Sequence, residues 1–313
     1  MSSQEMIDEI LKLKKEKNAV ILAHNYEVPE IQDIADFVGD SLGLSQEAAK
    51  TEADVIVFCG VHFMAETALI VSPNKKVLIP DTEAGCSLAS SITGDQLREW
   101  KKEHPGAVVV SYVNTTADVK AETDYCCTSS NAVKVINAIP ADKRILFCPD
   151  KFLGSYVKAM TGKDIEIWGG ACHVHEKIGE TDFNTAHKKH PNADFLIHPE
   201  CGCSTACMLK ASTSDAFKNV HIYSTEGMIN HVDKSDAEEF VIATEVGILH
   251  RLKKSNPDKE FFPVSENSIC EYMKMTTLEK LYDALLYEKH EVKVPEELAA
   301  KARIPIERML EIV

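Results

Sequence analysis

The feature that most constrains the fold of this chain is a pattern that occurs three times along its 313 residues. In each third, an apolar run with strand character leads into a polar loop, and a hydroxyl-rich segment typical of a helix start follows. The apolar runs are Ala19 to Ala23, Ala107 to Ser111 and Ala193 to Ile197, and the loops after them begin at His24, Tyr112 and His198. Such a repeat indicates three copies of one supersecondary unit.

The spacing within the copies supports this interpretation. The hydroxyl-rich segments are Gly39-Asp40-Ser41, Thr128-Ser129-Ser130-Asn131 and Ser224-Thr225-Glu226-Gly227. The distance from His24 to Ser41 is 17 positions, and so is the distance from Tyr112 to Ser129. The third copy is longer, and its extra residues contain a cysteine-rich loop from Cys201 to Cys207.

Two further strand patterns follow in each third. The first set is Val55 to Cys59, Ile145 to Cys148 and Phe240 to Thr244; the second is Val77 to Pro80, Ile165 to Trp168 and Phe261 to Val264. Strands that alternate with helical patterns at this spacing indicate parallel sheets with helical crossovers. The predicted fold is therefore α/β, with three similar units in a pseudo-threefold arrangement around a central active site.

The expected boundaries follow the repeat. We assign residues 1–103 to a first unit with an amphipathic N-terminal helix, 104–190 to a second unit and 191–277 to a third. Residues 278–313 are expected to form a helical segment that packs on the N-terminal helix. Ligands of open parallel sheets lie beyond the carboxyl ends of the strands, so the His24, Tyr112 and His198 loops should converge on one cavity.

Cysteine usage points to metal or redox chemistry. The chain has ten cysteines, no secretory signal pattern and no Cys-x-x-Cys pair, which argues against disulfides, a zinc ribbon and a thioredoxin-like motif. The densest group is Cys201, Cys203 and Cys207, but its spacing matches no common metal site. Cys172 follows a strand pattern and precedes a helix-like segment, and a turn of this kind favours a thiolate.

Three cysteines occupy matched positions after the last strand pattern of each third: Cys86, Cys172 and Cys270. Three thiolates without an evident fourth ligand suit a [4Fe–4S] cluster with one open iron, which acts as a Lewis acid. Structural zinc is the rival interpretation and would need a fourth ligand such as His173 or His175. In a third interpretation, Cys86 and Cys270 are ordinary loop cysteines, which their matched positions disfavour.

The net charge of −15 argues against a nucleic-acid partner. With only five arginines in the chain, an anionic substrate would be held by helix N-termini that carry Ser, Thr or Asn. No apolar run reaches the length of a membrane span, so we expect no membrane association and a cytoplasmic location.

Taken together, these segments resemble the quinolinate synthase family, the iron–sulfur enzymes of NAD biosynthesis, and the resemblance covers nearly the whole chain. It is carried by Ala23-His24-Asn25-Tyr26, Gly39-Asp40-Ser41, Cys59 to Glu66, Gly85-Cys86, Tyr112-Val113-Asn114, Cys127 to Ala132, Trp168 to His175, His198 to Cys201, Ser224-Thr225, Thr244-Glu245, and Cys270 with Met273-Lys274-Met275. The matched positions show no departure. Some relatives carry a Cys-x-x-Cys-type pair near the last ligand, whereas Cys270 stands alone.

The resemblance implies a condensation of iminoaspartate with dihydroxyacetone phosphate to quinolinate, phosphate and water. It also implies a [4Fe–4S] cluster held by Cys86, Cys172 and Cys270, in agreement with the repeat. The iminoaspartate would come from an aspartate oxidase or an aspartate dehydrogenase.

The loop residues suit the proton transfers and anionic substrates of such a reaction. Glu200 is a candidate general base, and His24 and Tyr26 are candidates to polarise a carbonyl or relay protons. A solvated carboxylate and a core histidine are the plain alternatives for Glu200 and His24. The remaining candidates contact substrate carboxylates, phosphate or the forming ring, although helix capping would equally explain each hydroxyl: Ser41, Tyr112, Asn114, Ser129, His175, His198, Ser224 and Thr225.

Two other functions stay open from the residues alone. An aconitase-like hydro-lyase would use the same open iron on a hydroxy acid, without triose phosphate. A non-catalytic metal-binding scaffold would not require His24, Tyr26 and Glu200 to meet the cysteines in one cavity.

Overall fold

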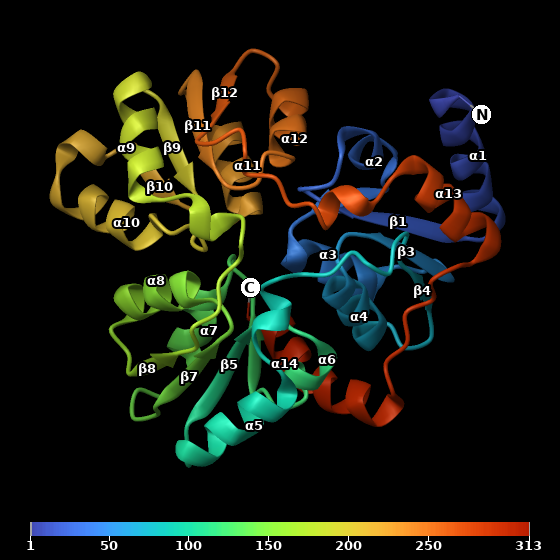
Figure 1. The fold of residues 1–313 in the computed structure, drawn as a ribbon, viewed down its shortest axis with the longest axis horizontal. Helices are drawn as coiled ribbons and strands as arrows, with labels where there is room; N and C mark the ends of the chain where they lie inside the picture. The colour runs from blue at the N-terminus through green and yellow to red at the C-terminus, as the bar shows by residue number, and fades with distance from the viewer. Residues whose placement is uncertain (1, 313) are drawn as a thin grey trace.

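The strands form three separate four-stranded sheets in the computed structural model, which describes residues 2–312 (Figure 1). The first sheet contains β1 (Ala19–His24), β2 (Phe37–Gly39), β3 (Val55–Cys59) and β4 (Lys76–Leu78). The second contains β5 (Val108–Tyr112), β6 (Tyr125–Cys127), β7 (Ile145–Cys148) and β8 (Ile165–Ile167), and the third contains β9 (Asp194–Ile197), β10 (Val220–Ile222), β11 (Glu239–Ala243) and β12 (Glu260–Pro263).

The three sheets share one topology. In each, the first strand of the unit pairs with the second and third, and the fourth pairs with the third, giving the orders β2-β1-β3-β4, β6-β5-β7-β8 and β10-β9-β11-β12. All of these pairings are parallel. The predicted α/β fold of three similar units is therefore confirmed. The sequence interpretation missed the edge strands β2, β6 and β10; β4 and β8 are equally short but belong to the predicted runs Val77 to Pro80 and Ile165 to Trp168.

Helices cover both faces of each sheet, as parallel sheets require. The α-helices are α1 (Ser3–Glu16), α2 (Pro29–Ile34), α3 (Ser41–Lys50), α4 (His62–Val71), α5 (Gly94–Glu103), α6 (Ala117–Lys120), α7 (Ala132–Ala138), α8 (Lys151–Thr161), α9 (Glu180–Lys189), α10 (Ser204–Thr213), α11 (Thr225–Lys234), α12 (Ile248–Ser255), α13 (Leu278–Tyr287) and α14 (Glu296–Glu311). Four 3-10 turns add η1 (Ala89–Ser91), η2 (His175–Lys177), η3 (Asp215–Phe217) and η4 (Met273–Met275).

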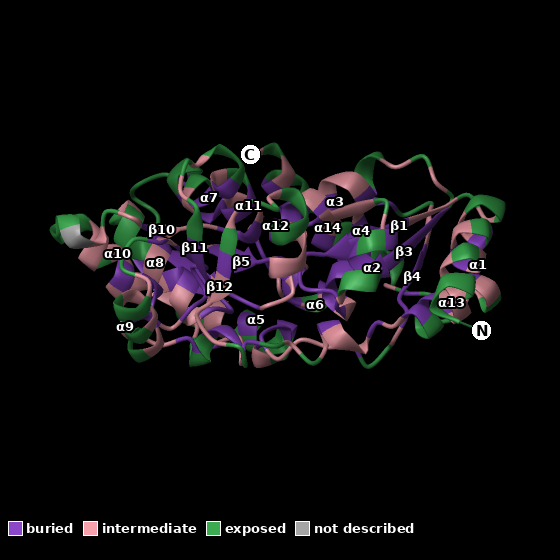
Figure 2. Ribbon diagram, turned by 90° about the horizontal axis from the view of Figure 1, so that it is seen from above, coloured by how far each residue is buried: buried purple, intermediate pink, exposed green. Residues whose placement is uncertain are grey.

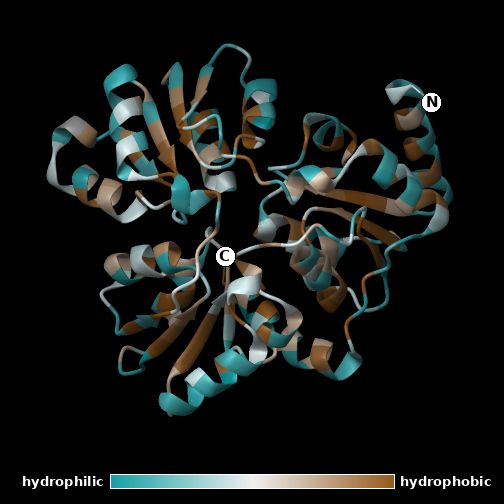
Figure 3. Cartoon of the chain, viewed as in Figure 1, coloured by the Kyte–Doolittle hydropathy of each residue, from teal (hydrophilic) through white to brown (hydrophobic). Residues whose placement is uncertain are grey.

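Burial on both faces explains why the central strands are continuously apolar. Every residue of β3, with the sequence VIVFC, is buried. The buried residues lie along the sheets and the exposed ones on the outer helices (Figure 2), and the hydropathy of the strands follows the same division (Figure 3). No helix within residues 2–312 has the length and apolar character needed to cross a membrane.

The helix that follows the last strand of each unit packs on the sheet of the next unit. The last strand of each unit is followed by a cysteine loop, and a helix begins eight positions after the cysteine: Cys86 to Gly94, Cys172 to Glu180 and Cys270 to Leu278. Leu97 of α5 packs in the core of the second sheet, and Phe183 of α9 packs in the core of the third. Leu281 of α13 packs in the core of the first sheet, which closes the ring.

The C-terminal helices divide between two units. Leu278, Leu281 and Leu285 of α13 share a core cluster with Ile10 and Leu13 of α1. In contrast, α14 packs against α4, α6 and β6, away from α1 (Figure 1). The boundaries expected at residues 103, 190 and 277 stay predictions.

Candidate active site

A central cavity of about 700 Å³, counting the space at its mouth, lies where the three units meet. Its walls include residues from the carboxyl ends of β1, β5 and β9 and from all three cysteine loops. The predicted site residues that line it are His24, Tyr26, Ser41, Cys86, Tyr112, Asn114, Ser129, Cys172, His175, His198, Glu200, Thr225 and Cys270. The remaining one, Ser224, lies just outside the wall, at the start of α11.

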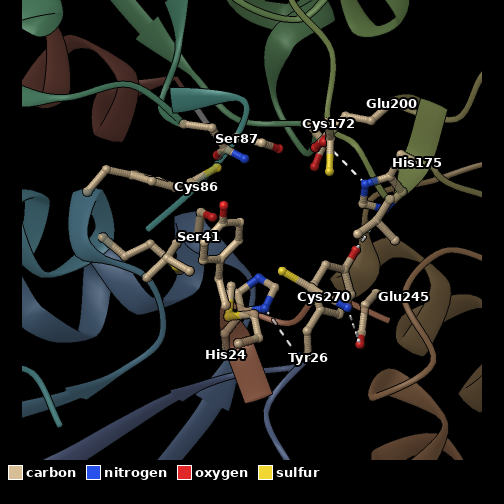
Figure 4. Close-up of a pocket in the computed structure, with 18 of the residues that line it drawn as sticks. His24, Tyr26, Ser41, Cys86, Ser87, Cys172, His175, Glu200, Glu245 and Cys270 are labelled. Atoms are coloured by element: carbon tan, nitrogen blue, oxygen red, sulfur yellow. Dashed lines mark hydrogen bonds and ion pairs between the residues drawn. The ribbon is translucent and has the colours of Figure 1, made fainter. Parts of the chain in front are cut away.

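The three cysteine loops have the same local structure. A 3-10 turn begins three positions after each cysteine: η1 after Cys86, η2 after Cys172 and η4 after Cys270. The turn brings backbone amides toward the sulfur, and the Ala89 amide donates a hydrogen bond of 3.4 Å to Cys86 Sγ. The three sulfur atoms point into the same cavity (Figure 4). Cys172 was expected at a direct strand-to-helix turn, but η2 intervenes before α9.

Close packing requires a glycine at position 170, two residues before Cys172. A Cβ atom on Gly170 would lie 2.3 Å from Ser91 Oγ and 2.5 Å from Pro149 O. Because these distances are far below van der Waals contact, only glycine lets the second cysteine loop pass against the first. Gly170 thereby fixes the position of Cys172 relative to the η1 loop.

The spacing of the three thiols bears on the kind of metal centre that they could hold. A tetrahedral zinc site holds its sulfur atoms about 3.8 Å apart, since each Zn–S bond is about 2.3 Å. Cys86, Cys172 and Cys270 do not form a group whose ligand atoms lie within 4.8 Å of one another, among residues 2–312. Burial and the neighbouring Cys172 raise the pKa of Cys270 to about 12, and burial also raises the pKa of Cys86. A bound metal centre would reverse these shifts, and the donor set fits a polynuclear one.

Glu200 lines the cavity and is held by three ring-bearing partners, Tyr112, His175 and His198. The Tyr112 hydroxyl donates a short hydrogen bond to Glu200 Oε1. His175 Nδ1 lies 3.4 Å from Glu200 Oε2, and His198 Nδ1 lies 3.7 Å from Oε1. Two units contribute to this group, because Tyr112 ends β5 and His175 follows β8 in the second unit, whereas His198 and Glu200 follow β9 in the third.

The environment moves the pKa values of Glu200 and His175 in opposite directions. Burial alone would raise the pKa of Glu200, but His175, His198 and the Tyr112 hydrogen bond outweigh it and lower the pKa to about 2. Burial alone would lower the pKa of His175, but Cys172 and Glu200 raise it well above its usual range. A carboxylate and an imidazolium therefore face one another in the cavity.

Two of the other cavity histidines, His24 and His198, are neutral. Burial lowers the pKa of His24 to about 3, with a further contribution from His198. Burial also lowers the pKa of His198 to about 3. Burial and the charge of Glu200 raise the pKa values of Tyr26 and Tyr112, so both phenols keep their protons at neutral pH.

Tyr26 is linked to the opposite side of the cavity through a threonine. Its hydroxyl lies 2.5 Å from Thr244 Oγ1, which in turn lies 2.8 Å from His175 Nε2. Thr244 was not predicted as a site residue. The repeat did not mark it, because in the register of the sheets Ala243, and not Thr244, matches Cys59 and Cys148.

The helix starts of the three units meet beside the cavity. Ser130 Oγ, before α7, donates to Asp40 of the first unit and lies 2.9 Å from Ser224 Oγ of the third. Asp40 caps α3 by accepting from Gly43 N at 2.9 Å, and Ser224 caps α11 by accepting from Gly227 N at 3.1 Å. Ser41, Ser129 and Thr225 adjoin these caps and face the cavity. Sequence reasoning placed Ser129 at a helix start, but the α7 cap is Asn131.

A buried lysine holds the loop that carries Tyr112 and Asn114. Lys120 is fully buried, and its ammonium donates to the carbonyls of Val113, at 2.8 Å, and Thr115. Asn114 Oδ1 is buried and, among the described residues, has no hydrogen-bond partner. An unsatisfied side-chain oxygen beside a cavity is suited to accept a hydrogen bond from a ligand. The sequence carried no signal for Lys120, because nothing in its neighbourhood distinguishes it from a surface lysine.

Two further acidic groups were missed. Glu245 Oε1 accepts from Cys270 N at 3.1 Å and lies 2.9 Å from Lys274 Nζ, so this ion pair anchors the third cysteine loop. Asp150 caps α8 through Leu153 N at 2.7 Å, and burial together with Glu200 raises its pKa to about 8.

Cys201, Cys203 and Cys207 do not line the cavity.

Comparison with known proteins shows the family of this chain. Residues 8–311 match the model of the family described as quinolinate synthetase A protein. The chain is 56% identical over 307 residues to the quinolinate synthase of Pyrobaculum aerophilum, covering 97% of this chain and 98% of that one. It is 53% identical over 313 residues to that of Thermus thermophilus, covering 100% and 99%, and 52% identical over 307 residues to that of Mycobacterium tuberculosis, covering 97% and 88%. The chain belongs to the quinolinate synthase family.

Proposed function

We propose that this protein condenses iminoaspartate with dihydroxyacetone phosphate to form quinolinate, phosphate and two waters for NAD biosynthesis. The observation that carries the proposal is the convergence of three equivalent cysteine loops, three helix starts and an acid–base pair on one cavity. Family membership and the names of the relatives support it.

Cys86, Cys172 and Cys270 are the residues that would hold a [4Fe–4S] cluster. Their origin in three separate loops, and the fact that no tight ligand group within residues 2–312 contains all three together, support a polynuclear centre over a single zinc ion. A cluster with three cysteine ligands supplies, when bound, one iron that can polarise a substrate hydroxyl or carboxylate as a Lewis acid.

The helix starts supply the positive potential that anionic substrates need in a chain with a net charge of −15. The N-terminal turns of α3 and α11 offer free backbone amides and the positive ends of two helix dipoles. The hydroxyls of Ser41, Ser129 and Thr225 add donors at the same wall. This arrangement supports phosphate or carboxylate binding without an arginine cluster.

The opposed pKa shifts of Glu200 and His175 suggest their roles. Two neighbouring groups whose pKa values are pushed apart serve as base and acid in the same reaction. Glu200, ionised, accepts a proton from a carbon next to the imine or carbonyl, and charged His175 donates a proton to a departing hydroxyl. Both dehydrations of the proposed reaction require this combination.

Neutral His24 and the protonated phenols of Tyr26 and Tyr112 act as hydrogen-bond donors. A neutral imidazole polarises a carbonyl oxygen without first losing a proton to it. Tyr26 shares its hydrogen-bond chain with Thr244 and His175, which allows a proton to pass between the two sides of the cavity. His198 and Asn114 complete the wall and orient substrate carboxylates.

The iminoaspartate must come from the oxidation of aspartate, by an oxidase or a dehydrogenase. We also propose a cytoplasmic location. All ten cysteines are free thiols in the structure, which suits a reducing compartment.

Anaerobic purification followed by iron and sulfide analysis and a quinolinate assay tests the proposal. We expect a brown protein with about four irons per chain that forms quinolinate only when both iminoaspartate and dihydroxyacetone phosphate are present. A colourless protein with bound zinc would contradict the cluster. An iron-loaded protein that dehydrates a hydroxy acid and releases no phosphate from triose phosphate would contradict the reaction.

A further inference from the structure

A second group of metal-ligating side chains lies in the third unit, outside the cavity. It consists of Asp194 at the start of β9, His221 in the middle of β10 and His231 on α11. One potential ligand atom from each residue lies within 4.8 Å of the other two. His231 Nε2 is 2.9 Å from Asp194 Oδ2, and the two imidazole centroids are 4.5 Å apart.

The location separates this group from the active site. Strands β9 and β10 and helix α11 lie side by side in the third unit (Figure 1). The first residue of α11 faces the cavity, and His231 lies six residues further along the helix. At a rise of about 1.5 Å per residue, the group lies about 9 Å down the helix from Thr225. None of its three residues lines the cavity.

The composition of the group differs from the other histidine–carboxylate pairs outside the cavity. His62–Glu66, His104–Glu166, His190–Glu239 and His250–Asp33 each join one imidazole to a nearby carboxylate. Only two groups of three such residues, among residues 2–312, bring their ligand atoms within 4.8 Å; one is Cys172, His175 and Glu200, and the other is this one. Two imidazoles and a carboxylate are a common donor set for divalent transition metals.

The geometry allows an ion to enter and the three side chains to close around it. Bonds of about 2.0–2.2 Å in a tetrahedral site place N and O ligands about 3.3–3.5 Å apart. The three side chains are all partly exposed, so side-chain rotations that move the ligand atoms by about 1 Å suffice to reach this spacing. His221 also borders a groove beside Tyr156 of α8 and Met208 of α10, which provides a path from solvent. Ser235 Oγ also donates a hydrogen bond to Asp194 Oδ2, at 3.2 Å, and orients the carboxylate.

We propose that Asp194, His221 and His231 form a binding site for a divalent transition-metal ion, with zinc as its typical occupant. Water completes the coordination from the groove. The ion joins β9, β10 and α11. Here β9 and β10 already pair in the sheet, while the His231 and Ser235 hydrogen bonds to Asp194 and the ring contacts among His221, Tyr223 and His231 connect the side chains. Its role is structural, because no residue of the proposed reaction contacts it.

Zinc titration of the full-length protein, with a matched histidine variant, tests the site. His221→Gln is the informative variant, because among the described residues His221 makes ring contacts and no hydrogen bond that the change would break. His250→Gln is the control, since His250 Nε2 also lies 2.8 Å from a carboxylate, that of Asp33, without a second imidazole. Zinc held at the cavity cysteines is present in all three proteins and cancels in the comparison.

We expect equilibrium dialysis to show about one zinc ion fewer per chain in His221→Gln than in the wild type or His250→Gln. Zinc should raise the melting temperature of the wild type and the control, but not that of His221→Gln. Cobalt substitution should add visible d–d bands in the wild-type-minus-variant difference spectrum, without a thiolate charge-transfer band.

Equal zinc content in the wild type and in folded His221→Gln would overturn the proposal. A thiolate-to-cobalt band in the difference spectrum would also overturn it, because it would place the lost metal at cysteines. Melting of all three proteins in chelator establishes that the variants are folded, and His231→Gln repeats the comparison with a second ligand.

Discussion

Cys201, Cys203 and Cys207 lie within one short segment of the third unit and are fully buried, whereas the cavity cysteines come from three distant loops. The buried three pack in one core cluster with Phe195 and Ile197. Cys201 donates from Sγ to Ala243 O at 3.2 Å, as a weak hydrogen-bond donor in an apolar surrounding. Cys86, Cys172 and Cys270 are partly exposed and share a ligand-accessible space (Figure 4).

Position in the repeat, and not density along the chain, therefore determines which thiols reach the cavity. Burial raises the pKa of Cys201 well above its usual value, as it also raises the pKa values of Cys86 and Cys270. Placement separates the two sets, because each cavity cysteine lies three positions before a 3-10 turn at the central cavity.

The largest effect is expected from Cys172→Ser. Loss of one of three thiolates should release the cluster and remove its contribution of several kcal/mol to the reaction, so quinolinate formation should fall by about 10³-fold or more. Anaerobic iron content and the quinolinate assay measure both consequences. The control is Cys148→Ser, at a buried cysteine outside the cavity whose Sγ lies 3.1 Å from Ser111 Oγ, and it should keep its iron and its activity. Full iron content in Cys172→Ser would remove this cysteine from the site.

A smaller effect is expected at Tyr112, which lines the cavity but is not proposed to hold metal. Tyr112→Phe removes the hydroxyl that donates to Glu200 and should lower kcat by about 10²-fold or more while iron content stays at the wild-type level. Tyr125→Phe is the matched control, because Tyr125 packs on β6 under Arg308, with 5.1 Å between the guanidinium and the ring centroid. Equal loss of activity in both variants would show that the Tyr112 effect is structural.

Lys120→Met tests whether buried polar groups near the cavity differ from the inert buried thiols. The change leaves the carbonyls of Val113 and Thr115 without their buried donor, which should lower the free energy of unfolding by about 1–3 kcal/mol. Because these carbonyls shape the loop of Tyr112 and Asn114, KM should rise more than kcat falls. Urea unfolding and steady-state kinetics measure the two effects.

The control for Lys120→Met is Lys101→Met. Lys101 Nζ also donates to a backbone carbonyl, that of Glu122 at 2.8 Å, but it lies on the outer surface. Its loss should change the unfolding free energy by less than about 1 kcal/mol. A Lys120→Met protein as stable and as active as Lys101→Met would show that the loop holds its shape without the buried ammonium.

Most of the fold was predictable because its signals repeat. The apolar runs of β1, β5 and β9 and the cysteines after β4, β8 and β12 recur at matched positions, so each copy supports the other two. The short strands β2, β6 and β10 were not predictable, because their pairing depends on a neighbouring strand distant in the sequence. The passing of α5, α9 and α13 to the next unit is likewise a tertiary property.

The site was predictable where chemistry and repeat coincide, as for Cys86, Tyr112 and His198. Lys120 and Thr244 escaped because their importance lies in what they touch: two loop carbonyls for the lysine, Tyr26 and His175 for the threonine. Such contacts join residues far apart in the chain, and a single sequence gives no measure of them. The pKa shifts of Glu200 and His175 depend on the same convergence.

The smallest effect is expected from Cys207→Ala, in the densest cysteine segment of the chain. Cys207 is fully buried on α10, so removal of its sulfur should lower the free energy of unfolding by about 1 kcal/mol through lost packing. Iron content and quinolinate formation should stay at the wild-type level, because Cys207 does not line the cavity. Measured together with Cys172→Ser, this variant separates the two cysteine sets in a single experiment: one should lose activity with little change in stability, and the other the reverse. Loss of iron from Cys207→Ala at unchanged fold would instead mean that the buried segment takes part in holding the metal centre, and the contrast between the two sets would fail.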